Sequence, residues 1–162
     1  MATLDTQHME KSERIVLILP RARAEMCAKL TNNALWTINK EAIFMDLENA
    51  GITHVIINFN GYCNSGQIEQ LEFWSGDIKI EPPEVMLPYL ERQQDGIEAM
   101  PKQVSLCGAV ENLVYDRLAL THCGWEEGEG ASGDIRFDVA TKTIQLDLYR
   151  RYSDVEHFAH VF

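Results

Sequence analysis

Apolar residues follow two periods along this chain, and each period predicts a different kind of element. From Arg21 to Trp36 they recur at helical spacing. A second helical pattern covers Lys40 to Ala50, where Asn39 is the expected N-cap and Gly51 the expected terminator. A third begins at Pro101 and runs to about Thr121. Its predicted inward stripe is formed by Val104, Cys107, Val110, Val114 and Leu118.

Alternation and β-branched residues predict two hairpins. A strand over Thr53–Phe59 is followed by a partner over Gln67–Trp74 and, after a turn, by a short strand over Ile78–Glu81. The final hairpin, Asp134 to Tyr149, has the clearest period of two, with a turn at 140–142. The apolar positions of its two strands are Ile135, Phe137, Val139, Ile144, Leu146 and Leu148.

Two segments carry weaker patterns. Glu13–Leu19 fits either a short strand or the first turns of a helix, and Pro20 interrupts both. Glu84–Met100 contains Pro88 and Gly96, so it is predicted to be irregular and to wrap the surface.

Together these elements predict an α+β fold, in which an antiparallel sheet of two hairpins carries helices packed on one face. Residues 1–12 are expected to be a flexible leader and residues 13–162 a single domain.

Charge narrows the classes of partner. The 162 residues include 14 Lys and Arg against 25 Asp and Glu, so the formal net charge is −11. A protein that binds nucleic acid directly needs a basic footprint, so nucleic acid is not an expected partner. The charge instead favours solubility and steers basic partners toward the protein.

Cysteines and apolar runs indicate the compartment. The cysteines at 27, 63, 107 and 123 form no C-x-x-C pair, which suits reduced thiols better than a disulfide framework. The first 14 residues have no signal-peptide pattern, and the longest apolar run, Ile15–Leu19, is too short to cross a bilayer. The sequence therefore predicts a cytoplasmic protein that does not contact a membrane.

The loop Asn60–Gln67 lies between two predicted strands and gathers small polar residues. Glycines at 61 and 66 allow unusual backbone geometry, and Asn64 and Ser65 can bond their own backbone. One interpretation is an ordered turn and no more. The other is a polar binding site in which Asn60, Asn64, Ser65 and Gln67 converge.

The segment Gly124–Gly133, between a helix and a hairpin, is rich in glycine and acid. Glu126, Glu127 and Glu129 precede Asp134 and Asp138, a set of oxygens that suits a hard cation. The spacing does not match the helix-loop-helix calcium pattern, so solvated acids on an architectural joint are the alternative. Trp125 is expected to anchor the joint to the core.

The end of the chain offers one further cluster. His157 and His160 could join His122-Cys123 around zinc if the tail folds back, but an ordinary surface tail is the preferred explanation of the pair. Phe158 and Phe162 predict that the tail docks through its aromatic rings.

Two blocks of the sequence resemble a family of small uncharacterised bacterial proteins. There the first block commonly reads NK…AGIT…FDGxGDSGQIE, and the second contains GWE…G…FDVA…TI…LD. The matching residues here are Asn39-Lys40, Ala50–Thr53, Gly61–Glu69, Tyr115-Asp116, Gly124–Glu126, Gly130, Gly133, Phe137–Ala140, Thr143-Ile144, Leu146-Asp147, Arg151-Tyr152, His160 and Phe162. The resemblance implies a protein of unknown function from a plasmid or phage-derived element.

This chain departs from the family pattern where that pattern is most polar. Asn60, Cys63 and Asn64 stand where Asp, Gly and Asp are usual, and Glu127-Gly128 replaces an Asn-Asp pair. If the family's acids serve a metal or acid–base chemistry, the resemblance implies that this member has lost it.

The sequence contains no phosphate-binding loop, dinucleotide fingerprint, zinc-protease motif or nucleophile elbow. We therefore predict no catalytic residues, no metal and no cofactor. The leading hypothesis is a small acidic protein that binds and modulates a host protein, as an anti-defence inhibitor would. The rival is an enzyme or small-ligand binder that uses the two polar loops around a divalent metal ion or a nucleotide-like molecule. A structural homodimer is a third option. The candidate ligand- or partner-binding residues are Asn60, Asn64, Ser65, Gln67, Glu69, Trp125, Glu126 and Asp138.

Overall fold

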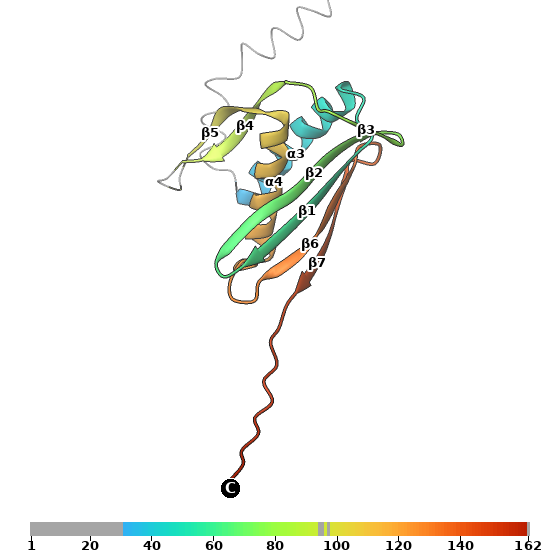
Figure 1. The fold of residues 1–162 in the computed structure, drawn as a ribbon. Coiled ribbons are helices and arrows are strands. Elements are labelled where there is room, and N and C mark those ends of the chain that lie inside the picture. The colour runs from blue at the N-terminus through green and yellow to red at the C-terminus, as the bar shows by residue number, and fades with distance from the viewer. Residues whose placement is uncertain (1–30, 94–95, 97, 162) are drawn as a thin grey trace, which may run out of the picture.

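The centre of the molecule is a five-stranded antiparallel sheet with the strand order β3-β2-β1-β6-β7 (Figure 1). The computed structural model describes residues 31–93, 96 and 98–161. The strands are β1 (His54–Tyr62), β2 (Ser65–Ser75), β3 (Ile78–Ile80), β6 (Ala131–Asp138) and β7 (Thr143–Arg150). The two predicted hairpins are confirmed, and pairing between β1 and β6 joins them into one sheet.

Alternation along each strand decides which face is covered. In β1 the side chains of Val55, Ile57 and Phe59 are buried, whereas those between them face the other side. The β1–β2 register shifts between Asn58 and Phe59, which leaves Glu69 as an extra residue in a β-bulge. Beyond the bulge, β1 and β2 stay paired up to their turn.

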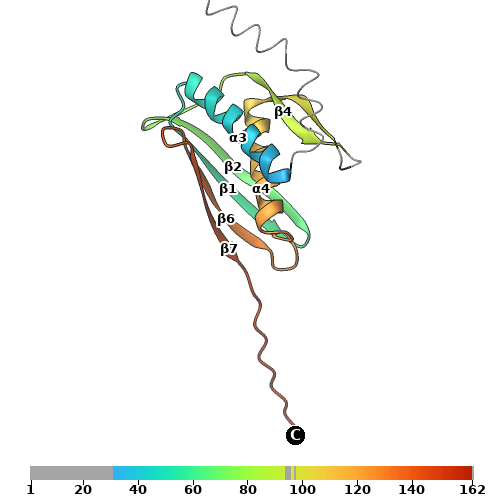
Figure 2. The ribbon, with the colours of Figure 1, turned by 180° about the vertical axis from the view of Figure 1, so that it is seen from behind.

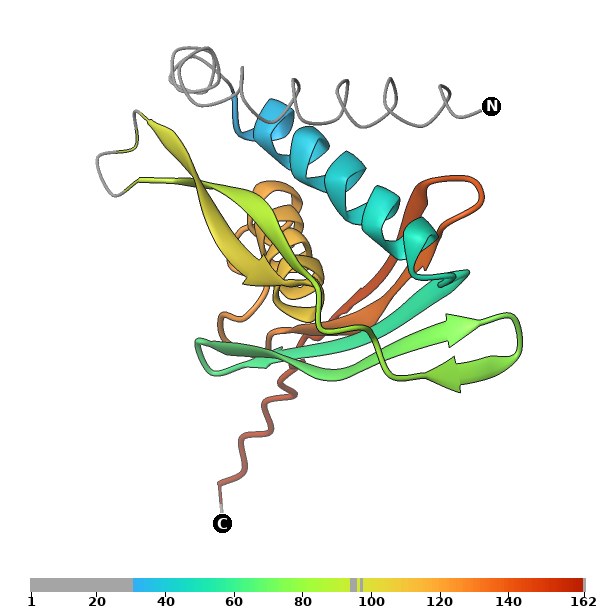
Figure 3. The same cartoon turned by 90° about the horizontal axis from the view of Figure 1, so that it is seen from above.

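Two helices, α3 (Asn32–Asn49) and α4 (Leu106–Thr121), pack on the same face of the sheet. Figure 2 and Figure 3 show both helices on that side, and no described element covers the opposite face. Phe44 of α3 stacks on Phe137 of β6 with ring centroids 5.7 Å apart. The indole of Trp36 donates a 3.0 Å hydrogen bond to the carbonyl of Leu113, which fixes α3 against α4. The fold is thus α+β, as the sequence predicts.

A separate two-stranded ribbon covers part of the helices. It consists of β4 (Met86–Arg92) and β5 (Ala99–Ser105), so the prediction that 84–100 is irregular was wrong. Pro88 suggested an irregular segment and Pro101 the first residue of a helix, because proline cannot donate to a ladder. In a ribbon of two strands each strand has a free edge, where that missing donor costs nothing.

The start of α4 corrects the prediction that Pro101 begins a helix. Pro101 pairs with Leu90 in the ribbon, and the helix begins only at Leu106. Ser105 is the N-cap, and its hydroxyl accepts from the backbone N–H of Gly108. The predicted stripe holds within the helix, where Val110, Val114 and Leu118 are buried, but Val104 lies in β5.

The two helices predicted before Gly51 meet in one. α3 is continuous from Asn32, with Thr31 as its N-cap, and the part of the first predicted helix before residue 31 lies outside the described residues. Asn39 is therefore not a cap, which corrects that prediction. Gly51 follows the helix with a φ of +72°, as expected of a glycine terminator.

The remaining predictions concern the two ends. The leader 1–12, the segment 13–19 and Cys27 lie outside the described residues. Residues 151–161 form neither helix nor strand and run away from both helices in Figures 1 and 3. Phe158 is 73% exposed, so the prediction that this ring docks the tail on the domain was wrong, and Phe162 is not among the described residues. No helix in the described part of the chain is long and apolar enough to cross a membrane.

Candidate functional site

The two loops that the sequence singled out lie against each other at one end of the sheet. The backbone N–H of Cys63 donates to the carbonyl of Gly128 at 2.9 Å, and that of Asn64 donates to the carbonyl of Glu126 at 2.8 Å. These bonds join the β1–β2 turn to the segment between α4 and β6. The juxtaposition on which a composite site depends is therefore present.

The β1–β2 connection is a two-residue hairpin loop. Its residues Cys63 and Asn64 have φ angles of 50° and 64°, the left-handed conformation that such loops require. Ser65 and Gln67 belong to β2 and are exposed. The loop is therefore an ordered turn, and a binding role for Asn64, Ser65 and Gln67 stays a prediction.

Trp125 is the anchor of the joint, and it is buried rather than presented to a ligand. Its ring meets Phe59 edge-on, with centroids 5.5 Å apart. Gly61 and Gly66 face the indole and leave no room for a Cβ. The neighbouring Glu126 has one buried carboxylate oxygen, Oε2, without a hydrogen-bond partner among the described residues.

Arg151, directly after β7, ties the joint together. Its Nε donates to the carbonyl of Glu129 at 2.7 Å, and its Nη2 donates to Oδ1 of Asn60 at 2.9 Å and to the carbonyl of Gly61. Its backbone N–H donates to the carbonyl of Gly130. One guanidinium therefore links the first hairpin, the helix-to-hairpin joint and the end of the sheet.

Beside Arg151, the uncovered face of the sheet is hollowed into a depression of about 560 Å³. Asn60 donates to Glu69 at 3.2 Å, and Asn58 donates to Asp134, so amide groups hold both carboxylates in place. Tyr149, which is 64% exposed, stands on β7. We call this the sheet-face depression, and its lining residues are Asn58, Phe59, Asn60, Glu69, Gln70, Ser132, Gly133, Asp134, Tyr149 and Arg151.

The sheet-face depression contains two of the eight predicted site residues, Asn60 and Glu69. Asp138 lies at the other end of β6, paired with His54. Its carboxylate accepts from the backbone N–H of Thr141, and this bond lowers the pKa of Asp138. Asp138 therefore shapes the β6–β7 turn and is not part of this depression.

The predicted site residues did not include six lining residues that carry polar side chains, namely Asn58, Gln70, Ser132, Asp134, Tyr149 and Arg151. Asn58, Asp134 and Tyr149 occupy alternate, outward positions of three strands, so the period of two contained the signal. Arg151 follows the last strand, where hydrophobic periodicity gives no signal, and only the resemblance to the family pattern included it. The proposed zinc set does not assemble, because His157 and His160 lie on the exposed tail. Within 31–93, 96 and 98–161, no three His, Cys, Asp or Glu side chains are grouped to hold a metal ion.

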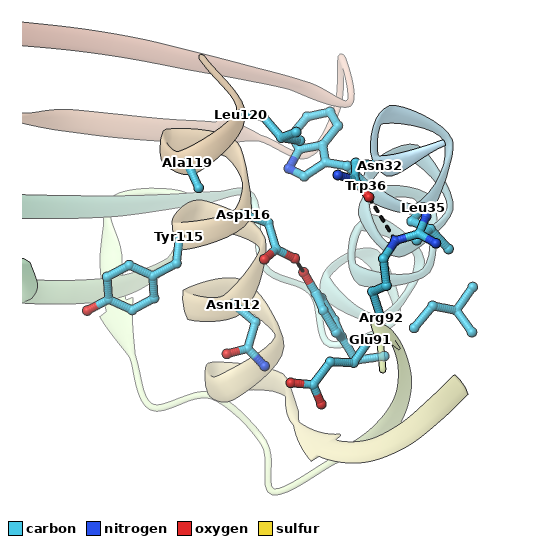
Figure 4. Close-up of a pocket in the computed structure, with 12 residues that line it drawn as sticks. Asn32, Leu35, Trp36, Glu91, Arg92, Asn112, Tyr115, Asp116, Ala119 and Leu120 are labelled. Atoms are coloured by element: carbon cyan, nitrogen blue, oxygen red, sulfur yellow. Dashed lines mark hydrogen bonds between the residues drawn. The ribbon is translucent and has the colours of Figure 1, made fainter. Parts of the chain in front are cut away.

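A second cavity, of about 400 Å³, lies between α3, α4 and β4 (Figure 4). The Tyr89 hydroxyl donates a 2.5 Å hydrogen bond to Asp116 there. Burial of the carboxyl raises the pKa of Asp116, and burial also raises the pKa of Tyr89. The Arg117 guanidinium covers the ring of Trp36, 4.6 Å from its centroid, on the edge of this cavity.

Comparison with models of protein families shows which family the chain belongs to. Residues 35–162 match the model described as a family of unknown function, DUF6878. The chain belongs to this family. The DUF6878 match includes both loops, the sheet-face depression and the whole tail. Neither the curated proteins nor the solved structures contained a match.

Proposed function

We propose that this protein binds a basic segment of a partner protein in the sheet-face depression and modulates that partner. The observation that carries the proposal is the pair of carboxylates, Glu69 and Asp134, each held by an amide side chain on an uncovered sheet face. An ionised carboxylate accepts several hydrogen bonds, so each keeps capacity for a donor from outside.

The charges of the depression favour a cation. Among the residues that line the depression, Arg151 is the one cation beside Glu69 and Asp134, and its side-chain hydrogen bonds go to uncharged oxygens. Tyr149 adds an exposed ring over which a guanidinium can stack. Carboxylates, amides and a tyrosine are together the chemistry that binds an arginine side chain. The net charge of −11 would attract a basic segment from a distance.

The shape favours a macromolecular partner over a small molecule. Sites for small ligands are mostly enclosed and apolar, and they bury most of the ligand. The sheet-face depression is lined largely by polar side chains on the open side of the sheet. A side chain that projects from a partner's backbone can use such a surface without being enclosed.

The biological setting is part of the proposal. A compact acidic protein from a plasmid or phage-derived element gains from binding a host protein, and inhibition of a host defence factor is the version we favour. The resemblance of the two sequence blocks supports this setting. Missing catalytic motifs, and the asparagines at 60 and 64 where the family pattern has aspartates, support binding over turnover.

Titration of an unstructured arginine-rich peptide into the full chain tests the mode of binding. We expect Asp134→Asn and Glu69→Gln each to weaken peptide binding about tenfold, equivalent to about 1.4 kcal/mol. Asp77→Asn, in the β2–β3 turn, is the matched control, because it removes the same charge outside the depression. Binding should weaken as salt is raised. Equal affinities in the four proteins would contradict the proposed site.

Pulldown from host lysate tests the role. Wild type should retain a host protein that Asp134→Asn loses and Asp77→Asn keeps. The rival function is tested by thermal shift against divalent metals and nucleotides, since a ligand that binds only the native state raises the melting temperature. A rise of several degrees with one of these ligands, together with no retained host protein, would favour the rival.

A further inference from the structure

The cavity between α3, α4 and β4 has walls that are tied to one another in pairs. Trp36 joins α3 to α4 through its 3.0 Å hydrogen bond to the carbonyl of Leu113. Asn39 joins α3 to β4, because its amide donates to and accepts from the backbone of Leu90. Tyr89 joins β4 to α4 through its hydroxyl. A cavity fixed in this way keeps its shape before a ligand arrives, which lowers the cost of binding.

The dimensions of this cavity suit a small molecule. Sites for small ligands have volumes of roughly 300 to 1,000 Å³, and this cavity has about 400 Å³. Residues of three elements wall it, whereas the sheet-face depression lies on one open face of the sheet. The proposed function uses the depression and leaves this cavity unassigned.

The lining changes from polar to apolar along α4. Asn112, Asp116 and Leu120 stand one turn apart on one face of the helix, because residues four apart are neighbours on a helix surface. Positions 112 and 120 are about 12 Å apart along the helix axis. Figure 4 shows Glu91 at the polar end and Trp36 at the apolar end. A ligand that fills the cavity thus needs one polar and one apolar end.

The carboxylate of Asp116 has one oxygen left for a ligand. Its Oδ2 accepts the hydrogen bond from Tyr89, and no described residue donates to its Oδ1. The side-chain amide of Asn112, one turn earlier, likewise forms no hydrogen bond with the described residues. Both side chains line the cavity, so it offers two acceptor oxygens without donors.

The charge at the polar end favours a cation. Burial raises the pKa of Asp116, the neighbouring Glu91 raises it further, and Tyr89 lowers it by donating to the carboxylate. None of the ion pairs between described residues includes Asp116, and Glu91 pairs with Lys102 at 3.5 Å. A carboxylate that has lost water and lacks a cationic partner is stabilised by a ligand that brings one.

Two arginines near the cavity are held by other groups. Arg92 donates from Nε to Asn32 at 2.9 Å and from Nη1 to a backbone carbonyl. The guanidinium of Arg117 lies over the ring of Trp36. Neither forms an ion pair with Asp116, so the place beside that carboxylate is open to a cation from outside.

We propose that this cavity binds a small primary amine with an apolar body. The ammonium group lies between Oδ1 of Asp116 and the side-chain oxygen of Asn112, and the body extends toward Trp36 and Leu120. An ammonium group has three donors for such oxygens. An inorganic cation would leave the apolar end unfilled, and a neutral ligand would leave the carboxylate without a counter-charge. This second site does not depend on the proposed function.

Isothermal titration calorimetry of the full chain with phenethylamine tests the role of charge. We expect saturable binding of phenethylamine and at least about tenfold weaker binding of phenethyl alcohol, which has the same body without the charge. Equal affinities for the two compounds, or no saturable binding of the amine, would overturn the proposal.

Variants locate the ammonium group. Asp116→Asn should weaken phenethylamine binding about tenfold and leave the affinity for phenethyl alcohol unchanged, since the charge alone is lost. Asparagine keeps an oxygen that can accept from Tyr89, so β4 stays tied to α4. Asp134→Asn, in the sheet-face depression, is the matched control and should bind both compounds as wild type does. An Asp116→Asn variant that binds phenethylamine as tightly as wild type would overturn the site.

Leu120→Ala tests the apolar end. Leu120 is 39% exposed, so the fold should tolerate the change. Because the body of both compounds rests on this side chain, both affinities should fall by about fivefold. Unchanged affinities would place the body elsewhere and overturn the proposed orientation.

A lysine side chain of another protein carries the same ammonium group. N-acetyl-lysine methylamide presents that group from a peptide backbone. It should bind at least about tenfold more weakly than phenethylamine, because a walled cavity favours a ligand that it can enclose. Equal or tighter binding of the lysine compound would assign the cavity to a protein partner and overturn the proposal.

Discussion

The indole of Trp125 occupies the space beside Gly66 that a side chain would otherwise fill. A Cβ added to Gly66 would overlap the six-membered ring of Trp125, and one added to Gly61 would lie 2.8 Å from the same ring. The first hairpin therefore needs a residue without a side chain at each place where the joint between α4 and β6 is anchored.

Gly66→Ala should destabilise the protein by about 2 to 3 kcal/mol, because the methyl group forces the indole or the hairpin to move. Equilibrium unfolding in urea measures the change. In a Trp125→Leu background the same substitution should cost clearly less, since the smaller side chain leaves room for the methyl group. If Gly66→Ala lowered the free energy of unfolding equally in both backgrounds, contact with the Trp125 ring would not be the cause of the destabilisation.

Asn39→Ala should destabilise the fold by about 2 to 5 kcal/mol. Asn39 is buried; its Nδ2 donates to the carbonyl of Leu90 at 2.9 Å, and its Oδ1 accepts from the N–H of Leu90 at 2.8 Å. Alanine leaves both backbone groups without their partner. Met45→Ala, an exposed position of α3, is the control and should change the free energy of unfolding by less than about 0.5 kcal/mol.

Arg151→Gln should loosen the two loops more than it destabilises the whole domain. The substitution removes the bonds to Glu129, Asn60 and Gly61, and we expect a loss of about 1 kcal/mol in global stability. Hydrogen exchange at the amides of Cys63 and Asn64 should become faster. Arg150→Gln removes a neighbouring charge with no such bonds among those described, and protection at these amides should persist in that variant.

The pKa shift of Asp116 predicts a pH dependence. Burial raises its pKa above the unfolded value, so the stabilisation is complete below the usual aspartate pKa and is lost as pH rises through the raised value. Thermal melting of wild type and Asp116→Asn should be compared from about pH 3 to about pH 8. The melting temperature of wild type should fall relative to that of Asp116→Asn as pH increases.

Tyr89→Phe sharpens the same measurement. The Tyr89 hydroxyl donates to the carboxylate and so lowers the pKa of Asp116 against the effect of burial. Without that donor the pKa should rise further, and the loss of stability should extend to higher pH. A curve parallel to wild type would mean that Asp116 does not titrate in this range.

Individual residues show which parts of the fold could be predicted from the sequence and which could not. The final hairpin was predictable because its apolar residues alternate in the sequence and the same residues face the covered side of the sheet. Asn39 was not, because the same residue type that caps helices also bonds a neighbouring strand, and only tertiary structure decides between the two. Pro88 and Pro101 misled for a related reason, since their tolerance depends on having a free strand edge.

The candidate site was predictable in part. Asn60 and Glu69 stood out as polar residues in and just beyond a compact loop. The sequence singled out both loops, and only the structure shows that they contact each other. Asn58 and Asp134 meet only because β1 pairs with β6, a long-range contact that no local pattern encodes. Arg151 acts through partners that lie far from it in sequence, so its role could not be predicted, although Arg151-Tyr152 is part of the family resemblance.

The position of β1 has a consequence for how the chain reaches this structure. β1 forms the centre of the sheet, yet one of its two partners, β6, is synthesised only after β3, β4, β5 and α4. Until β6 emerges, one edge of β1 stays open and part of the apolar face formed by Val55, Ile57 and Phe59 lacks its cover. Closing so distant a pair is slow, which exposes the nascent chain to aggregation. Yield of folded protein should therefore improve when expression is slowed by cooling.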